Sequence, residues 1–127
     1  MALLDHLILN VNDVEASVVF YTEVMGFGDE GTDGPFRVVR VSRDMTIQLA
    51  PRGTEGGEHL AFALSPDEFE VVFGRIRASG LDYGDSFHDV GNMQGPGNEL
   101  GARGGGPTVY LFDPSRHLIE IRHYGEG

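Results

Sequence analysis

The 127-residue chain contains neither cysteine nor lysine. Without cysteine it has no disulfides, no thiolate metal ligands and no cysteine nucleophile. Without lysine it cannot form a Schiff base with a carbonyl substrate. No apolar run is long enough to span a membrane. The first ten residues lack a basic start and already contain Asp5 and His6, which argues against a signal peptide. We therefore expect a cytoplasmic protein.

Positive charge is also scarce. The chain contains nine arginines and 20 acidic residues, which gives a formal net charge of −11. We expect no nucleic-acid partner, because phosphate binding requires a basic surface. An acidic surface either favours a cationic ligand or simply keeps the protein soluble. With 40% hydrophobic residues, the chain is expected to fold as a single domain, residues 1–127, around a substantial core.

An internal repeat organises the chain. Asp5-His6-Leu7 and Glu58-His59-Leu60 lie 53 residues apart. Each half reads as a strand, a helix and then further strands. We therefore predict an α+β fold of two βαβββ modules, about residues 3–50 and 57–124. The modules should be related by a pseudo-twofold axis, with mixed sheets curled around a cavity.

Local patterns place the elements of the first module. A strand is expected over residues 3–11, followed by a helix over 14–25 that Asp13 caps and Gly26 ends. Two more strands are expected over 35–42 and 45–50, and the turn-rich segment before them has room for a short one.

The second module repeats this order. A strand over 58–64 leads to a helix that begins at a Ser65 or Asp67 cap and runs to about Ala78. A final hairpin is expected over residues 108–122. Between them, residues 91–107 hold seven glycines and two prolines, which predicts a long irregular loop.

Four polar side chains fall at matching places of the repeat, each on an otherwise apolar strand: His6 with His59, and Gln48 with Glu120. Glu120 lies between two isoleucines, where a carboxylate is costly unless something pairs with it. His59 shares its strand face with two alanines, which leave open space beside the imidazole. Two imidazoles and one carboxylate suit a divalent Fe, Zn, Mn, Ni or Co ion, and they match the facial triad.

Other polar residues are weaker candidates. Tyr110 precedes Glu120 by ten residues and can point at the same cavity, or it can be a core tyrosine with its hydroxyl at the rim. Arg103, in a glycine-rich run that lacks the features of a phosphate-binding loop, is expected to be solvated, although it can hold an anionic group. The remaining histidines are expected to be structural or on the surface, namely His88, His117 and His123.

These motifs resemble the two signatures of the vicinal oxygen chelate superfamily. The first resemblance lies in Asp5-His6-Leu7, Asp13–Ser17 and Phe20–Phe27, and the second in Tyr110–Pro114 and Leu118–Ile121. The superfamily includes glyoxalase I, methylmalonyl-CoA epimerase, extradiol dioxygenases, fosfomycin-modifying transferases and bleomycin-resistance proteins. The resemblance implies paired βαβββ modules, a divalent metal in the cavity, and a homodimer whose sites are often completed across two subunits.

The resemblance also implies roles for single residues. His6, His59 and Glu120 take the metal-ligand positions of the first, fifth and last strands, and Gln48 takes a fourth. Glyoxalase I usually carries Glu at that fourth position, whereas methylmalonyl-CoA epimerases carry Gln. Extradiol dioxygenases place an active-site tyrosine where this chain has Tyr110. They also carry a base histidine on strands that here contain none, so the reaction class stays open.

Three functions follow as hypotheses. The first is a divalent-metal-dependent enzyme, dioxygenase- or lyase-like, whose small substrate chelates the metal through vicinal oxygens. In it Glu120 is a ligand and proton shuttle, and Tyr110 is an acid or orienting group. The second is a non-catalytic antibiotic-binding protein of the bleomycin-resistance type, for which the charge of −11 suits a cationic drug. The third is a fosfomycin thiol transferase, whose phosphonate pocket requires more basic groups than the scattered arginines here.

Overall fold

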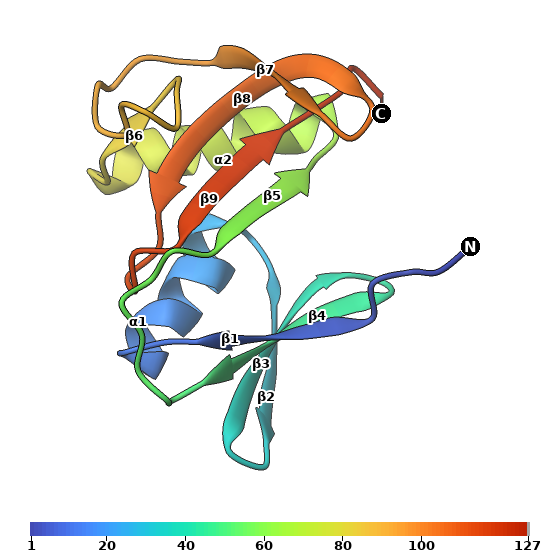
Figure 1. The fold of residues 1–127 in the computed structure, drawn as a ribbon, viewed down its shortest axis with the longest axis vertical. Coiled ribbons are helices and arrows are strands. Elements are labelled where there is room, and N and C mark those ends of the chain that lie inside the picture. Colours follow the sequence, from blue (N-terminus) through green and yellow to red (C-terminus); the bar gives the residue numbers. More distant parts are fainter. Residues whose placement is uncertain (127) are drawn as a thin grey trace. The chain divides into compact units, whose positions relative to one another are not determined.

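The computed structural model describes residues 1–126, which cluster into two compact units, Met1–Gly56 and a second that begins at Gly57. Each unit contains one mixed β-sheet and its helices (Figure 1). The predicted α+β class is therefore confirmed. Within the described residues, no helix has both the length and the apolar character needed to cross a bilayer.

The first unit follows the predicted βαβββ order. Strand β1 pairs in parallel with β4, and β3 and β2 continue the sheet in antiparallel fashion, giving the order β1-β4-β3-β2. The predicted helix over 14–25 is present as an α-helix that continues into a π-helical turn. The elements are β1 (His6–Asn10), α1 (Val14–Val19), η1 (Phe20–Val24), β2 (Gly28–Asp33), β3 (Phe36–Ser42) and β4 (Met45–Ala50).

The second unit repeats the topology. Strand β5 pairs in parallel with β9, and β8 lies antiparallel beside β9, so the order is β5-β9-β8-β6 with β7 also paired to β8. The repeat read from the sequence is thus present in the strand order. The elements are β5 (His59–Ala63), α2 (Pro66–Ser79), β6 (Tyr83–Gly84), β7 (Gly97–Gly101), β8 (Gly104–Phe112) and β9 (Leu118–Arg122).

The helix ends form where the sequence predicts. The Asp13 side chain accepts a hydrogen bond from the Ala16 backbone N–H at 3.0 Å. Ser65 caps α2 in the same way and forms a reciprocal capping box with Glu68. Gly80 ends α2 at φ 78°, a left-handed conformation that glycine adopts without steric cost.

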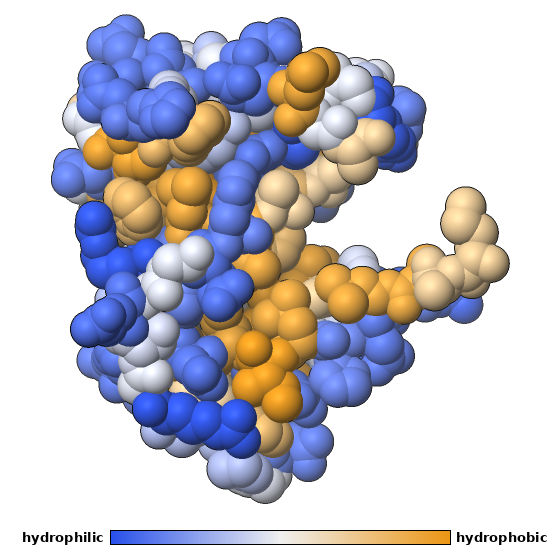
Figure 2. All heavy atoms as spheres, viewed as in Figure 1, coloured by the Kyte–Doolittle hydropathy of each residue, from blue (hydrophilic) through white to orange (hydrophobic). Residues whose placement is uncertain are grey.

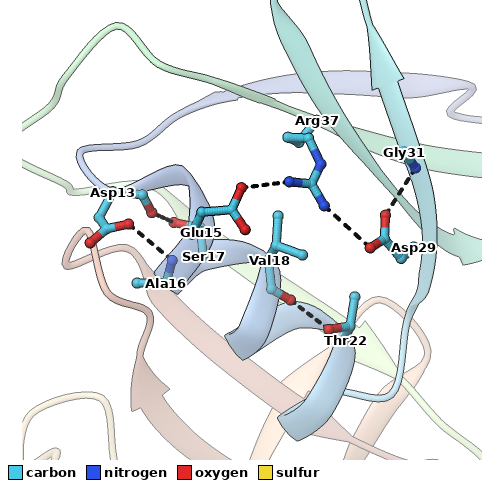
Figure 3. A network of polar contacts seen from close by, with 9 residues as sticks. All are labelled: Asp13, Glu15, Ala16, Ser17, Val18, Thr22, Asp29, Gly31 and Arg37. Atoms are coloured by element: carbon cyan, nitrogen blue, oxygen red, sulfur yellow. Dashed lines mark hydrogen bonds and ion pairs between the residues drawn. The ribbon is translucent and has the colours of Figure 1, made fainter.

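A network of ion pairs fixes α1 on its sheet. Arg37 on β3 donates to Glu15 at the start of α1 at 2.6 Å and to Asp29 on β2 at 3.2 Å (Figure 3). The Asp29 carboxylate also accepts the Gly31 N–H at 2.9 Å, where the β2–β3 register shifts. One arginine therefore connects the helix with two strands.

The prediction of a wholly irregular loop over residues 91–107 is wrong. Strand β7 pairs with β8 over five residue pairs, and β8 begins at Gly104, four residues earlier than expected. The glycines belong to the strand because backbones approach closely there: a Cβ on Gly106 would collide with the His123 carbonyl oxygen. Glycine in this hairpin therefore reflects packing and not disorder.

Each sheet has one face in a core and one face that carries polar residues. In the second unit α2 lies along one face of the sheet (Figure 1), and Ile119 and Ile121 point to that side with the buried face of the helix. Side chains alternate along β9, so Glu120 belongs to the other face. The first unit is arranged alike, with Ile47 and Leu49 buried and Gln48 on the opposite face.

Candidate metal centre

In the second unit, strand register brings His59 and Glu120 together. On parallel β5 and β9, His59 lies opposite Leu118 and Ala61 opposite Glu120, so both polar side chains occupy one face, two register positions apart. His59 Nε2 lies 3.1 Å from Glu120 Oε1. The Glu120 side chain is 7% exposed, whereas that of His59 is 49% exposed. A nitrogen and a carboxylate oxygen thus converge where the imidazole remains accessible.

The second oxygen of Glu120 has a different partner. Arg122 Nη1 donates to Glu120 Oε2 at 3.0 Å, and both side chains are buried. The sequence analysis assigned no role to Arg122. Strand alternation was the available signal, because a residue two positions after Glu120 must lie on the same face of β9.

Tyr110 lies directly across from Glu120. The β8–β9 register pairs the two residues, and Tyr110 is buried. Burial, followed by the negative charge of Glu120, raises the pKa of the Tyr110 hydroxyl to about 12. Near neutral pH the phenol is therefore protonated and able to donate a hydrogen bond toward the carboxylate.

The first unit holds the matching pair. On parallel β1 and β4, His6 lies opposite Thr46 and Ile8 opposite Gln48, which is the same offset of two register positions that separates His59 from Glu120. His6 Nδ1 lies 2.7 Å from the Asp5 carboxylate. A proton on Nδ1 leaves Nε2 as the free nitrogen, the arrangement in which histidines ligate metals.

A cavity of about 380 Å³ lies beside Glu120 in the second unit. Small side chains on β5 and the β7–β8 turn line it, and the guanidinium of Arg103 stacks at 4.4 Å from the ring of Tyr124. Arg103 also pairs with Glu126 at 3.2 Å. The two alanines that share a strand face with His59 thus line open space, as the sequence predicts, but His59 itself does not line this cavity. The cavity is lined by Ala61, Ala63, Leu100, Gly101, Ala102, Arg103, Glu120, Arg122 and Tyr124.

The other histidines are either packed in the core or exposed on the surface. His117 is buried, and its Nδ1 accepts the Glu58 N–H at 3.2 Å. His123 packs edge-on against Phe69 at 5.1 Å between ring centroids, and His88 is exposed beside Phe87.

Of the predicted ligands, the structure brings His59 and Glu120 together in one unit and aligns His6 with Gln48 in the other. Imidazole nitrogen, carboxylate and amide oxygen are a donor set that fits a borderline divalent cation.

Comparison with known proteins identifies the family of the chain. The pattern of the Glyoxalase/Bleomycin resistance protein/Dioxygenase superfamily matches residues 3–121. The chain belongs to this superfamily. The match includes both strands of each candidate ligand pair.

Relatives within the superfamily span nearly the whole chain. Oxidase ChaP-H1 is 30% identical and superposes with a TM-score of 0.80, covering 98% of this chain and 97% of that one. Virulence protein STM3117 of Salmonella typhimurium is 28% identical over 130 residues, covering 95% of this chain and 83% of the relative. The fosfomycin resistance protein FosX from Mesorhizobium loti shares the fold, with 16% identity, a TM-score of 0.69 and coverage of 98% and 93%.

Proposed function

We propose that this protein is a divalent-metal-dependent enzyme of the glyoxalase/dioxygenase type. Its metal would be Fe, Zn, Mn, Ni or Co, held by His6, Gln48, His59 and Glu120. The observation that carries the proposal is the 3.1 Å approach of His59 Nε2 to Glu120 Oε1 beside a cavity. His6 and Gln48 have the same register offset as His59 and Glu120, which supports their role as the second pair of ligands to the same ion.

The two ligand pairs would meet on one ion, either within one chain or between two copies. A homodimer is part of this proposal. It is supported by apolar side chains that stay exposed along β1 and the residues before it (Figure 2), where Leu3 is 75%, Leu4 64% and Ile8 47% exposed. Exposed apolar surface of this kind is typical of association sites.

When bound, the metal supplies Lewis acidity to two vicinal oxygens of a small substrate. The protein's own groups orient the substrate and move protons. Glu120 would shuttle a proton to or from the substrate, and the protonated Tyr110 hydroxyl would donate a hydrogen bond to a substrate oxygen. The substrate body would lie in the cavity against Ala61 and Ala63.

Among these chemistries we favour an oxidoreductase. The relative at 30% identity over nearly the whole chain is named an oxidase, which supports an oxygen-dependent reaction here. A lyase reaction remains the second choice, because Gln48 leaves only one carboxylate in the proposed ligand set.

Metal analysis of protein purified without chelator tests the proposal. We expect one divalent ion per site, and we expect His6→Ala, His59→Ala and Glu120→Ala each to lose it. The matched control is His88→Ala, which removes an exposed histidine and should retain the metal. If His6→Ala keeps full metal content, the two pairs do not share an ion.

A ligand assay separates catalysis from sequestration. Oxygen uptake in the presence of catechol, lost in Glu120→Ala, favours the enzyme. The −11 charge supports the alternative of an antibiotic-binding protein for a cationic drug. Tight bleomycin binding that survives Glu120→Ala, with no turnover, would favour that alternative.

A further inference from the structure

Arg122 is a buried arginine with no role in the proposed ligand set. It is 2% exposed, and its guanidinium bridges two parts of the second unit. Nη1 donates to Glu120 Oε2 at 3.0 Å, and Nη2 donates to the carbonyls of Glu99 and Gly104 at 3.1 and 3.2 Å. Nε is buried without a hydrogen-bond partner. Burying a guanidinium costs free energy that its hydrogen-bond partners must offset.

The contacts of Arg122 decide which oxygen of Glu120 is available. Oε2 is engaged by the guanidinium, while Oε1 faces His59. We propose that Arg122 is a positioning residue that holds the Glu120 carboxylate so that a single oxygen, Oε1, is presented to the metal site. This inference rests on the proposed metal function. It adds that Glu120 binds the metal through Oε1 alone, because Arg122 holds Oε2.

The β7–β8 hairpin supplies independent support. A Cβ placed on Gly101 would lie 2.5 Å from Arg122 Cζ and Nη1, and it would also collide with the Tyr124 hydroxyl. Glycine at this position therefore leaves the space in which the guanidinium lies. Because Glu120 and two hairpin carbonyls fix the guanidinium, it cannot simply move aside. The hairpin thus sets the orientation of Glu120 through Arg122.

Positioning and simple electrostatics predict opposite effects on metal affinity. As a nearby positive charge, Arg122 would repel a divalent cation, so its removal would tighten binding. As a positioning residue, it holds a ligand in place, and loss of such an outer partner typically weakens metal binding about 10–100-fold. The sign of the change therefore distinguishes the two roles.

The experiment measures cobalt(II) binding to the purified full-length chain, by competition with a chelator and by the visible absorption of the bound ion. We expect Arg122→Met, Arg122→Lys and Gly101→Ala each to bind cobalt(II) about 10–100-fold more weakly than the wild type, with an altered absorption band. Lysine keeps the charge but lacks the two-armed guanidinium, and Gly101→Ala changes no charge at all. The matched control is Gly105→Ala, whose Cβ would approach only Asn98 Oδ1, at 3.2 Å, and which should bind like the wild type.

Circular dichroism and thermal melting without metal establish that each variant is folded. If Arg122→Met does not fold, the comparison rests on Gly101→Ala and Arg122→Lys, which keep a cation near Glu120. Wild-type affinity and spectrum in Gly101→Ala and Arg122→Lys, or tighter binding by Arg122→Met, would overturn the inference alone. Absence of cobalt(II) binding by the wild type would overturn the proposed function and the inference with it.

Discussion

The raised pKa of Tyr110 predicts a specific loss of stability at alkaline pH in the metal-free protein. The unfolded chain ionises this hydroxyl at about 10, whereas the folded chain holds it protonated to about 12. Between these values the unfolded state binds fewer protons, so stability is fully present below pH 10 and falls as the pH rises toward 12. For these two values, the loss between pH 9 and pH 11 is about 1 kcal/mol.

The composition makes this effect measurable. The chain has no cysteine and no lysine, so in the unfolded state the side chains that titrate near pH 10 are its four tyrosines. We expect urea unfolding, with chelator present, to show a steeper decline from pH 9 to pH 11 for the wild type than for Tyr110→Phe, by about 1 kcal/mol. In parallel, the absorbance at 295 nm should show a late tyrosine step that Tyr110→Phe removes.

Tyr124→Phe serves as the control, because it removes a tyrosine that does not pair with Glu120 across the sheet, and the late step should remain. Equal pH dependence of stability in the wild type and Tyr110→Phe would refute the reasoning. So would a Tyr110 step that coincides with the other tyrosines. Either result would mean that burial and the Glu120 charge do not act on this hydroxyl as the geometry implies.

Three further predictions address the helix cap, the cavity and the first histidine. Ser65→Ala removes the side-chain half of the α2 capping box and should lower the free energy of unfolding by about 1 kcal/mol in urea titrations. Ala63→Phe fills the cavity beside Glu120 and should weaken substrate or drug binding while leaving metal content unchanged in elemental analysis. Asp5→Ala removes the acceptor that orients His6 and should weaken cobalt(II) binding by up to about 10-fold, measured by chelator competition. Unchanged affinity would show that this exposed pair does not orient His6.

Much of the fold could be predicted because its signals are local. Asp13, Ser65 and Gly80 end helices through contacts with their own neighbours, and apolar alternation marks β4 and β9. The repeat in the sequence added the topology, since two similar halves require similar strand orders. These predictions needed no knowledge of distant contacts.

The β7–β8 hairpin could not be predicted for the opposite reason. Its strands consist largely of glycine, which carries no alternation signal and normally marks turns. What stabilises them is backbone pairing in a defined register, and the close approach of Gly101 to Arg122 and of Gly106 to the His123 carbonyl. These requirements come from parts of the chain that are distant in sequence, so they become visible only in three dimensions.

The same contrast applies to the candidate site. Matching positions in the repeat suggested His59 and Glu120, and the structure places their side chains 3.1 Å apart. Arg122 was overlooked because an arginine near the end of a strand usually reaches solvent. Its burial depends on the hairpin carbonyls that receive it, which the sequence did not reveal.

Register also shows where the two halves differ, and the difference bears on the chemistry. Positions equivalent to Gln48 and Ala50 in the first unit are Glu120 and Arg122 in the second. A buried carboxylate and its cationic partner thus appear together in one half, and both are absent from the matching positions of the other. A buried carboxylate needs a compensating charge whenever no metal is bound, whereas an amide does not. Arg122 therefore supplies the charge that the buried Glu120 carboxylate requires, while the other carboxylate oxygen still faces His59.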